Sequence, residues 1–496
     1  MGIKGIYGEI GPGERTALSK LAVQHFEKSG RPLRIAIDIS IWQIQVQSAK
    51  GGSNPALRTL YYRLLRLLSL FIQPLFVFDG PKKPTFKRNR RVGTNAASLP
   101  DFLAKQLIKL FGFPHHIAPG EAEAECALLQ QQGLVDAVLS EDVDTLMFGC
   151  GMALRNWSSE GTRGSKSPTH VSVYDATKIR ENNPGMDREG MVLIALMSGG
   201  DYIPAGIPGC GIRIAREAAA AGFGKGLFLH EKDATGMKNW REKLVHEMQS
   251  NESKFFRVKH RSLQIPDDFP NRTVLRYYTR PAVSSMERVE QLRSGLTWNP
   301  AVDLPGLRIF VADAFDWTHR SGAKKLVRGL APALVVHELC QRVETPGTQG
   351  RPARSDEGYL QGFFGKRVHF STDGLPEIRI GYVPLDFVSI DLDAEDSDTE
   401  DVGGEAGGID GEEALMLESG DDAAGRDAPA SPSKRRPPLY DPTQVEKVWI
   451  LDSFVRKGVP QQLKEWEDAQ LAPKPRAPTK ERSKQPKTKE ARWMHT

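Results

Sequence analysis

Short apolar runs alternate with longer amphipathic stretches over the first two thirds of the chain. Three runs, "LRIAIDIS", "QPLFVFDG" and "VDAVLSEDVD", have the nearly continuous apolar character of buried parallel strands. Between the first two, "ALRTLYYRLLRLLSLF" repeats its leucines at helical spacing and predicts an amphipathic helix. This alternation over residues 1–345 predicts an α/β domain with a doubly wound, mostly parallel sheet.

The pattern changes after this domain. Residues 346–357 are rich in Pro, Gly and charge and predict a linker. Residues 358–470 predict a small domain of short strands, with a turn at Asp373-Gly374, closed by one amphipathic helix over "VEKVWILDSFVRKGVPQQLKEWE". Inside it, residues 391–437 form an acidic low-complexity insertion that we expect to be disordered. Residues 471–496 predict a disordered basic tail.

Composition narrows the class of protein. The 496 residues are 39% hydrophobic, and no apolar run approaches the roughly 20 residues that span a bilayer, so we expect an intracellular protein without a membrane partner. The four cysteines form no C-x-x-C pair, which argues against a zinc site or a disulfide framework.

The net charge of +5 is unevenly distributed, because residues 391–427 carry fifteen Asp or Glu against Arg426 alone. The rest of the chain carries +19, as expected for a polyanionic partner or for scattered surface lysines.

Carboxylates follow the predicted strands where those strands end. Asp38 ends "IAIDIS", Asp79 ends "LFVFDG", and Asp142 and Asp144 follow "AVLS". A single Asp at a strand end is usually a turn or a helix cap, but the carboxyl ends of parallel strands meet at one ligand-binding edge. With Asp201 and the glutamates of "APGEAEAECA", such a set would repel unless cations neutralised it, and oxygen ligands favour Mg²⁺ or Mn²⁺. In a basic protein this pattern favours two-metal phosphodiester cleavage over a set of caps and surface acids.

Six segments resemble, in this order, the flap-endonuclease and XPG superfamily of structure-specific nucleases: "MGIKGIYG", "IAIDIS", "FVFDG", "APGEAEAECA", "SEDVDTLMFG" and "GGDYIPAGIPGCGIRIA". The resemblance covers residues 1 to about 330. It implies a PIN-like fold with an N-region at 1–95, a helical arch at about 81–115, and an I-region at 116–330 containing a helix-two-turns-helix at about 198–222.

The resemblance also implies the metal ligands. Two Mg²⁺ ions, for which Mn²⁺ is expected to substitute, would be held directly or through water by Asp38, Asp79, Glu121, Glu123, Asp142, Asp144 and Asp201. Every acidic position of the pattern is filled, whereas Glu125 occupies a position that the motif leaves variable. From helical spacing alone, Glu121 would instead pair with Glu125.

DNA contacts are implied around this acidic set. Gly2 is expected to become the N-terminus and to pack near the metals and the DNA. The segment "GIPGCGIRIAREAAA", which on its residues alone could be an ordinary tight loop, is expected to grip the uncut strand and to hold a structural K⁺ on backbone carbonyls. The expected DNA-binding residues are Gly2, Lys4, Lys82, Lys83, Arg90, Arg91, Gly209, Gly211 and Arg213, the last replacing a lysine common in the family.

The segment between Asp79 and Glu121 is short and strongly basic. Lys87 and Arg88 are predicted to be catalytic, as a clamp on phosphates near the scissile bond, although a solvated loop or a nuclear import signal would show the same composition. Flap endonucleases use this region for a long arch and cap. A shorter segment suits a branched substrate without a free end, such as a four-way junction.

The C-terminal domain resembles the chromodomain of the eukaryotic Holliday junction resolvases of this superfamily. In "EGYLQGFF", Leu360, Phe363 and Phe364 fit the core of a small barrel better than a sliding-clamp peptide, whose glutamine is replaced by Glu357. Residues 254–261 and 276–280 interleave aromatic and basic residues, which is typical either of nucleic-acid contacts or of half-buried helix faces.

Together these features predict a nuclear, Mg²⁺-dependent DNA endonuclease. It would resolve four-way junctions by paired symmetric nicks and also cut 5′ flaps, in recombination and repair. We expect branched DNA as its partner, a homodimer assembled on the junction and a monomer when free; sliding-clamp contact remains an open alternative. The alternatives in function are a flap endonuclease restricted to free 5′ ends and a non-catalytic scaffold that binds branched DNA.

Overall fold

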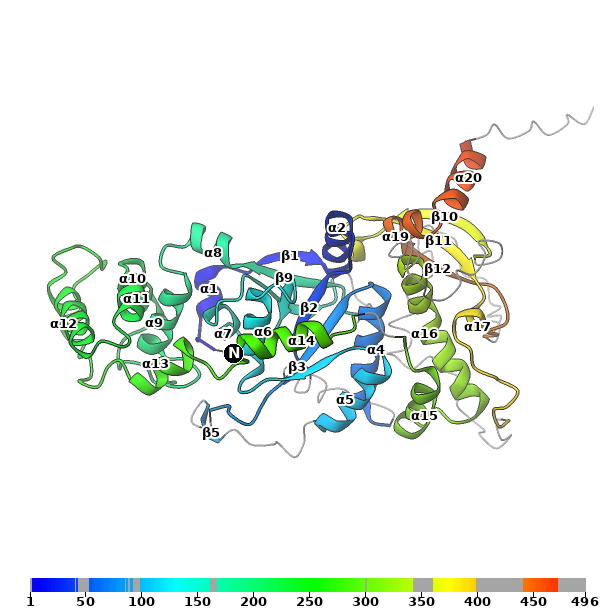
Figure 1. Cartoon of the computed structure of the whole chain (residues 1–496). Coiled ribbons are helices and arrows are strands. Elements are labelled where there is room, and N and C mark those ends of the chain that lie inside the picture. Colours follow the sequence, from blue (N-terminus) through cyan, green and yellow to red (C-terminus); the bar gives the residue numbers. More distant parts are fainter. Residues whose placement is uncertain are drawn as a thin grey trace, which may run out of the picture.

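The computed structural model describes residues 2–40, 42, 53–84, 86–87, 90–91, 99–160, 167–298, 301–341, 360–397 and 440–471. At its centre lies a seven-stranded sheet of order β1-β9-β8-β7-β2-β3-β6 (Figure 1). Five neighbouring strands are parallel: β8 (Met152–Ser158), β7 (Ala137–Leu139), β2 (Arg34–Asp38), β3 (Gln73–Phe78) and β6 (His115–Ile117). At one edge, β9 (His170–Asp175) and β1 (Glu14–Ala17) add antiparallel pairs. The predicted α/β class with a mostly parallel sheet is confirmed.

Alternate residues of the central strands enter two cores on opposite faces of the sheet. Ile35 and Ile37 of β2 belong to a core with α2 (Leu18–Ser29), α4 (Pro55–Ser69) and α5 (Asp101–Leu110). Ala36, between them, belongs to the other core with α6 (Ala122–Gln131), α7 (Asp144–Met147) and α9 (Arg188–Ser198). Because helices cover both faces, the central strands β2, β3 and β7 are mostly apolar. The amphipathic helix predicted after Pro55 is α4, whose leucines are buried.

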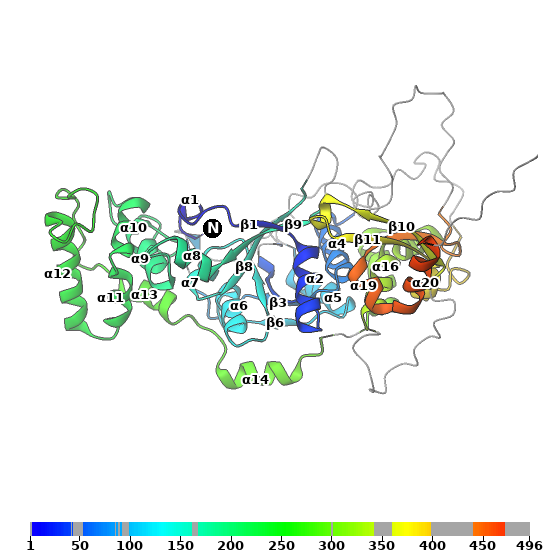
Figure 2. The same ribbon diagram turned by 90° about the horizontal axis from the view of Figure 1, so that it is seen from above.

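A helical lobe forms one end of the molecule. It contains α10 (Ile212–Ala220), α11 (Phe223–Leu229), α12 (Ala234–Ser250) and α13 (Arg272–Thr279), and both views place it at the end opposite the C-terminal strands (Figures 1 and 2). Short helices α1 (Ile6–Ile10) and α8 (Ala176–Asn182) lie between this lobe and the sheet. The chain then returns through α14 (Met286–Gly295) and α15 (Leu304–Phe315) to α16 (His319–Gln341), which packs on α4.

The C-terminal domain has a three-stranded antiparallel sheet of order β10 (Gly362–Val368), β11 (Pro376–Tyr382), β12 (Glu446–Leu451). Between β10 and β11 lies η2 (Phe370–Thr372), and α17 (Pro384–Phe387) follows β11. Helices α19 (Asp452–Gly458) and α20 (Pro460–Leu471) close the domain.

The prediction of one helix over residues 445–467 is wrong. Its first part is β12, in which Trp449 lies opposite Arg379 of β11, and the remainder is two helices separated at Val459. The run from Val448 to Ile450 is β-branched and aromatic, so it takes the strand conformation once a partner edge is present. That edge lies more than sixty residues earlier in the chain, where helical periodicity carries no information about it.

The C-terminal domain shares a core with the α/β domain. Ile378, Ile380 and Ile450 belong to the same apolar cluster as Leu339 of α16. Phe454 of α19 packs edge-on against Phe26 of α2, with ring centroids 5.7 Å apart. The two domains therefore form one packed unit through α2, α16 and α19.

A polar contact reinforces this docking. At the predicted turn, Asp373 adopts a left-handed conformation with φ of 51°. Its carboxylate accepts a hydrogen bond from the Ala17 amide at 2.9 Å and lies 2.9 Å from Nε2 of His170. The turn between β10 and β11 is thus tied to the β1–β9 edge of the central sheet.

The acidic insertion begins with an ordered segment. Glu395 forms a two-pronged ion pair with Arg308 of α15, and the Arg320 amide donates to the Asp396 carbonyl at 3.0 Å. Glu395 is therefore held against α15, while most residues of 391–397 are exposed. The rest of the predicted insertion, the linker at 346–357 and the tail from residue 472 lie outside the described residues.

Leu360 and Phe363 pack in the C-terminal core, as predicted. Leu360 is buried, and Phe363 contacts Trp466 of α20 with ring centroids 5.6 Å apart. Phe364 is instead 46% exposed and lies beneath Lys447, so the prediction fails for that ring. Among the described helices, none is both long and apolar enough to cross a membrane.

Candidate metal centre

Seven carboxylates gather at the carboxyl edge of the parallel strands. Asp38 ends β2, Asp79 directly follows β3, Asp142 follows β7, and Asp144 begins α7. Asp201 follows α9, Glu121 is the residue that begins α6 as its N-cap, and Glu123 lies in the first turn of α6. All but the half-buried Asp79 are buried. The structure thus brings together all of the predicted metal ligands at one edge.

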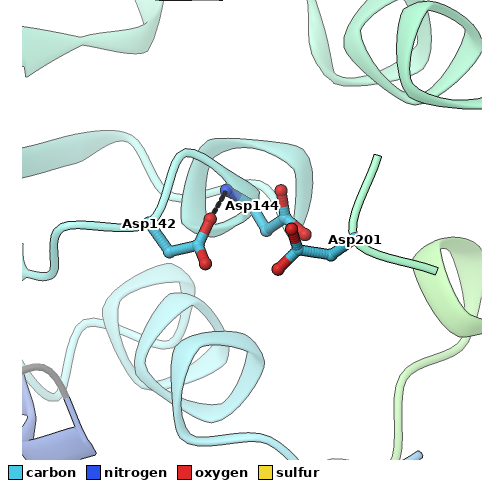
Figure 3. Close-up of side chains that lie close together, drawn as sticks. All are labelled: Asp142, Asp144 and Asp201. Atoms are coloured by element: carbon cyan, nitrogen blue, oxygen red, sulfur yellow. Dashed lines mark hydrogen bonds between the residues drawn. The ribbon is translucent and has the colours of Figure 1, made fainter. Parts of the chain in front are cut away.

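Three of these aspartates are close enough to share one cation. One carboxylate oxygen from each of Asp142, Asp144 and Asp201 lies within 4.8 Å of the others (Figure 3). The Asp144 amide donates to Oδ1 of Asp142 at 3.2 Å. Among the described residues, neither carboxylate oxygen of Asp144 has a hydrogen-bond partner, although both are buried. Buried acceptors without donors are costly, and a divalent cation on an all-oxygen ligand set would satisfy them, so these residues fit a Mg²⁺-type site.

Lys87 joins the two glutamates to this cluster. Its Nζ lies 2.6 Å from Oε1 of Glu123 and 3.1 Å from Oε1 of Glu121. The same ammonium lies 3.3 Å from Oδ2 of Asp201. Lys87 therefore neutralises part of the carboxylate charge from strand β4 (Phe86–Lys87), which pairs with β5 (Arg90–Arg91).

Close backbone contacts hold the edge together. Asp79 accepts a hydrogen bond from the Ala122 amide at 2.9 Å, which fixes the start of α6 against the end of β3. Next to it, the Gly80 amide donates to the Gly120 carbonyl at 2.7 Å. A Cβ on Gly80 would lie 1.7 Å from the Ala118 carbonyl oxygen, so only glycine allows these two segments to approach so closely.

Burial and mutual repulsion perturb the protonation of these groups. Burial, followed by the neighbouring charge of Asp79, raises the pKa of Asp38 to about 7. Burial also raises the pKa values of Glu123 and Asp144 well above their usual range, and nearby carboxylates add to the shift. Burial alone would lower the pKa of Lys87, but Glu123 and Glu121 hold it well above its usual range. The buried carboxylates therefore favour binding of cations.

Gly2 lies against the metal ligands, as predicted. Its amide donates to Oδ1 of Asp201 at 3.0 Å. It has φ of +79°, and a Cβ there would lie 2.3 Å from Oδ1 of Asp144 and 2.8 Å from Oδ1 of Asp142. A side chain at this position would push into the carboxylate cluster.

Glu125 lies apart from the centre. It is fully buried, 2.9 Å from Nε2 of His116, and accepts a hydrogen bond from the Ser284 amide at 2.8 Å. The helical pairing of Glu121 with Glu125 is not present. Glu121 is the N-cap of α6, and of the three glutamates only Glu121 and Glu123 lie at the metal edge, where both contact Lys87.

The other predicted DNA-binding residues vary in placement. Lys83 lies 3.4 Å from Asp79, whereas Lys82 and Lys4 are exposed. Arg90 and Arg91 are described only as backbone of β5, and Arg88 lies outside the described residues. Gly209 and Gly211 are exposed in the turn between α9 and α10, and Gly211 is the N-cap of α10, two positions before the exposed Arg213.

Sequence reasoning missed two side chains that orient the carboxylates. The Tyr202 hydroxyl donates a hydrogen bond to Glu121, and the Ser140 hydroxyl donates to Oδ2 of Asp38 at 3.2 Å. Both residues directly adjoin predicted ligand motifs, in "GGDY" and "AVLSED". Their position beside the ligand motifs was the only signal in the sequence. Hydroxyl side chains are too common for that position alone to predict a contact with a ligand.

Family models match three regions of the chain. The XPG N-terminal domain matches residues 1–98, the XPG I-region matches 112–201, and the Holliday junction resolvase Gen1 C-terminal domain matches 359–469. A solved structure of a eukaryotic junction-resolving enzyme GEN-1 is 47% identical, with a TM-score of 0.78, over 95% of this chain and all of that one. A second, of the Holliday junction-resolving enzyme GEN1 with product DNA and Mg²⁺, is 46% identical with a TM-score of 0.75 and the same coverage.

Curated relatives are nucleases as well. The human flap endonuclease GEN homolog 1 is 34% identical over 198 residues, which are 36% of this chain and 21% of the human protein. The matched part thus spans about a fifth of that relative. The fold and the carboxylate edge define a nuclease domain of the XPG type. The chain belongs to the XPG and flap-endonuclease superfamily, in the branch that contains the GEN junction-resolving enzymes.

Proposed function

We propose that this protein is a Mg²⁺-dependent, structure-specific DNA endonuclease that resolves four-way junctions and also cuts 5′ flaps. One observation carries the proposal. The cluster of Asp142, Asp144 and Asp201 is complete and buried, and Asp144 has no donor for its oxygens among the described residues. A scaffold that only binds branched DNA would gain nothing from such a costly group of buried carboxylates.

The ligand set assigns roles to this chain's own residues. The seven carboxylates would hold two Mg²⁺ ions, directly or through water, and Mn²⁺ is expected to replace them. When bound, such ions lower the pKa of an attacking water and stabilise the leaving oxygen. Tyr202 and Ser140 orient Glu121 and Asp38 by hydrogen bonding. Lys87, on its flexible stem, would move from the carboxylates to the scissile phosphate, where we also place Arg88.

Further parts of the proposal concern DNA and assembly. We propose that Gly209, Gly211 and Arg213 hold the uncut strand, with K⁺ on the turn between α9 and α10, and that the chromodomain-like C-terminal domain also contacts DNA. Two symmetric nicks require two active sites, so two copies would assemble on one junction while the free protein is a monomer. The nucleus is the expected location of such a repair enzyme.

A cleavage panel tests this function. The protein is incubated with labelled four-way junction, 5′ flap, 3′ flap and plain duplex, in Mg²⁺ and in chelator, alongside Asp38→Asn. Paired, ligatable nicks in the junction that need Mg²⁺ and Asp38 would support the resolvase. Cutting confined to free-ended flaps would favour the flap endonuclease instead, and binding without cutting in Mg²⁺ or Mn²⁺ would leave only the scaffold.

A further inference from the structure

The loop between α12 and α13 presents a group of cations that the nuclease site does not use. Residues 252–264, here called the basic loop, carry a net charge of +3. Four of its side chains are exposed: Lys254, Arg257, Lys259 and Arg261. Within the part of the chain that the structure describes, none of these four forms an ion pair. Its only acidic residue, Glu252, lies 3.3 Å from His246.

The basic loop is held in a defined shape. Phe256 is buried, and its amide and carbonyl both bond the side chain of Asn251, at 2.9 and 2.7 Å. The His260 amide donates to the Met248 carbonyl at 2.7 Å, and Ser253 bonds the carboxylate of Glu247 through both its amide and its hydroxyl. The interleaved aromatic and basic pattern is therefore neither a helix face nor a loose loop. Its cations are presented on a preorganised backbone.

The loop is attached to α10, the helix that follows the glycine turn beside the metal centre. The Arg257 amide donates to Glu217 of α10 at 3.1 Å. Glu217 stands one helical turn from Arg213, so the loop borders the α10 face that carries Arg213. Leu263, at the other end of the loop, is buried near the turn, where a Cβ added at Gly209 would lie 3.9 Å from its Cδ1. The turn, Arg213 and the basic loop thus form one continuous edge that begins next to Asp201.

We propose that the basic loop binds the phosphate backbone of a duplex arm that extends from the metal centre past the glycine turn. This inference rests on the proposed nuclease function, and it names the part of the substrate that the loop contacts. A duplex with a phosphate at the carboxylate cluster, lying along the exposed turn, reaches the loop next. The loop would then extend the phosphate contacts along that arm and position the junction relative to the metals.

Duplex DNA fits the loop better than single-stranded DNA. Stacking of unpaired bases needs exposed aromatic faces. Phe256 is buried, and Phe255, although 37% exposed, packs edge-on against Phe223 with ring centroids 6.2 Å apart. The loop offers unpaired cations and few free rings, which suits a phosphate backbone whose bases are already stacked.

The test compares two triple variants of equal charge. Arg257→Ser, Lys259→Ser and Arg261→Ser remove three loop cations; Lys28→Ser, Arg180→Ser and Arg288→Ser remove three exposed cations from α2, α8 and α14. Affinity for four-way junctions is measured against salt. Loss of three phosphate contacts should lower the slope of log affinity against log salt by roughly 2 to 3 and weaken binding about tenfold or more. The control should bind as wild type does.

The length of the junction's duplex arms tests where along the DNA the basic loop binds. Junctions whose arms shrink from about 16 to about 6 base pairs, roughly 54 to 20 Å of duplex, should lose affinity for the wild type and not for the loop variant. A charge-conserving triple variant, Arg257→Lys, Lys259→Arg and Arg261→Lys, should retain the wild-type slope and arm dependence, which separates charge from folding. Equal binding by the two serine variants, or an equal loss on single strands, would overturn the inference. Junction cleavage by the wild type tests the nuclease proposal separately.

Discussion

Glu125 pairs with His116 inside the protein, 2.9 Å from carboxylate oxygen to Nε2, on the side of α6 that turns away from the metal edge. Burial opposes ionisation, but the hydrogen bonds from His116 and Ser284 hold the pKa of Glu125 below its usual range. The glutamates of "APGEAEAECA" therefore divide by role. Glu121 and Glu123 face the cation site, whereas Glu125 fastens α6 to β6 and to the segment before α14.

Replacing Glu125 should affect stability and leave the chemistry intact. Glu125→Ala removes one partner of a buried pair and leaves the Ser284 amide without an acceptor. The free energy of unfolding should fall by about 3 kcal/mol or more. We expect a clearly lower Tm, with junction cleavage retained below the unfolding transition. Glu125→Gln, which can still accept from Ser284, should recover part of the Tm. Loss of cleavage in a folded Glu125→Gln protein would place this residue in the active site after all.

Asp144 should show the opposite behaviour. Its carboxylate is buried among like charges without a donor among the described residues, so Asp144→Asn relieves repulsion in the metal-free protein. We expect a Tm in chelator that is raised by a few degrees and a loss of Mg²⁺-dependent cleavage. Added Mg²⁺ should raise the Tm of the wild type more than that of the variant. A variant that is less stable in chelator would show that Asp144 is structurally satisfied.

Asp144 and Glu125 show which parts of the site could be predicted from the sequence and which could not. Strand-end aspartates were predictable because the carboxyl ends of β2, β3 and β7 meet at one edge whatever the details of packing. The partners of Glu125 were not, since Ser284 lies 159 positions away and its amide carries no side-chain signal. The strand at residues 446–451 failed for the same reason: its pairing edge is distant in sequence. Non-local contacts decided both cases.

The protonation of Asp38 should make the metal-free protein less stable as pH rises. Its folded pKa of about 7 exceeds the ordinary 3.8, so the folded state holds this proton more tightly than the unfolded chain does. The contribution is complete below pH about 4 and is lost as pH rises to about 7, amounting to at most about 4 kcal/mol. Thermal unfolding in chelator should show this decline in the wild type and a smaller one in Asp38→Asn. If the Tm of the two proteins changed with pH in the same way, Asp38 would not be the group responsible.

Lys87 should compete with the metals for the carboxylates. Its ammonium lies within 3.3 Å of Glu121, Glu123 and Asp201. Lys87→Met should therefore bind Mn²⁺ more tightly than the wild type in the absence of DNA, while cleaving junctions more slowly at saturating metal. Lys83→Met, which removes a more weakly placed lysine beside Asp79, is the comparison for calorimetric titration of Mn²⁺. Weaker binding of Mn²⁺ by Lys87→Met would contradict the competition.

Gly2 offers a steric test of the whole centre. A methyl group there would lie 2.3 Å from Oδ1 of Asp144, and φ of +79° is unfavourable for alanine, so Gly2→Ala must displace either the N-terminal segment or the ligand. We expect cleavage to fall by at least tenfold, with only a small fall in Tm. Gly8→Ala is the matched control, because a Cβ at Gly8 meets no atom within 4 Å among the described residues. If both variants cleaved junctions at the wild-type rate, the N-terminal segment would not help to position Asp144.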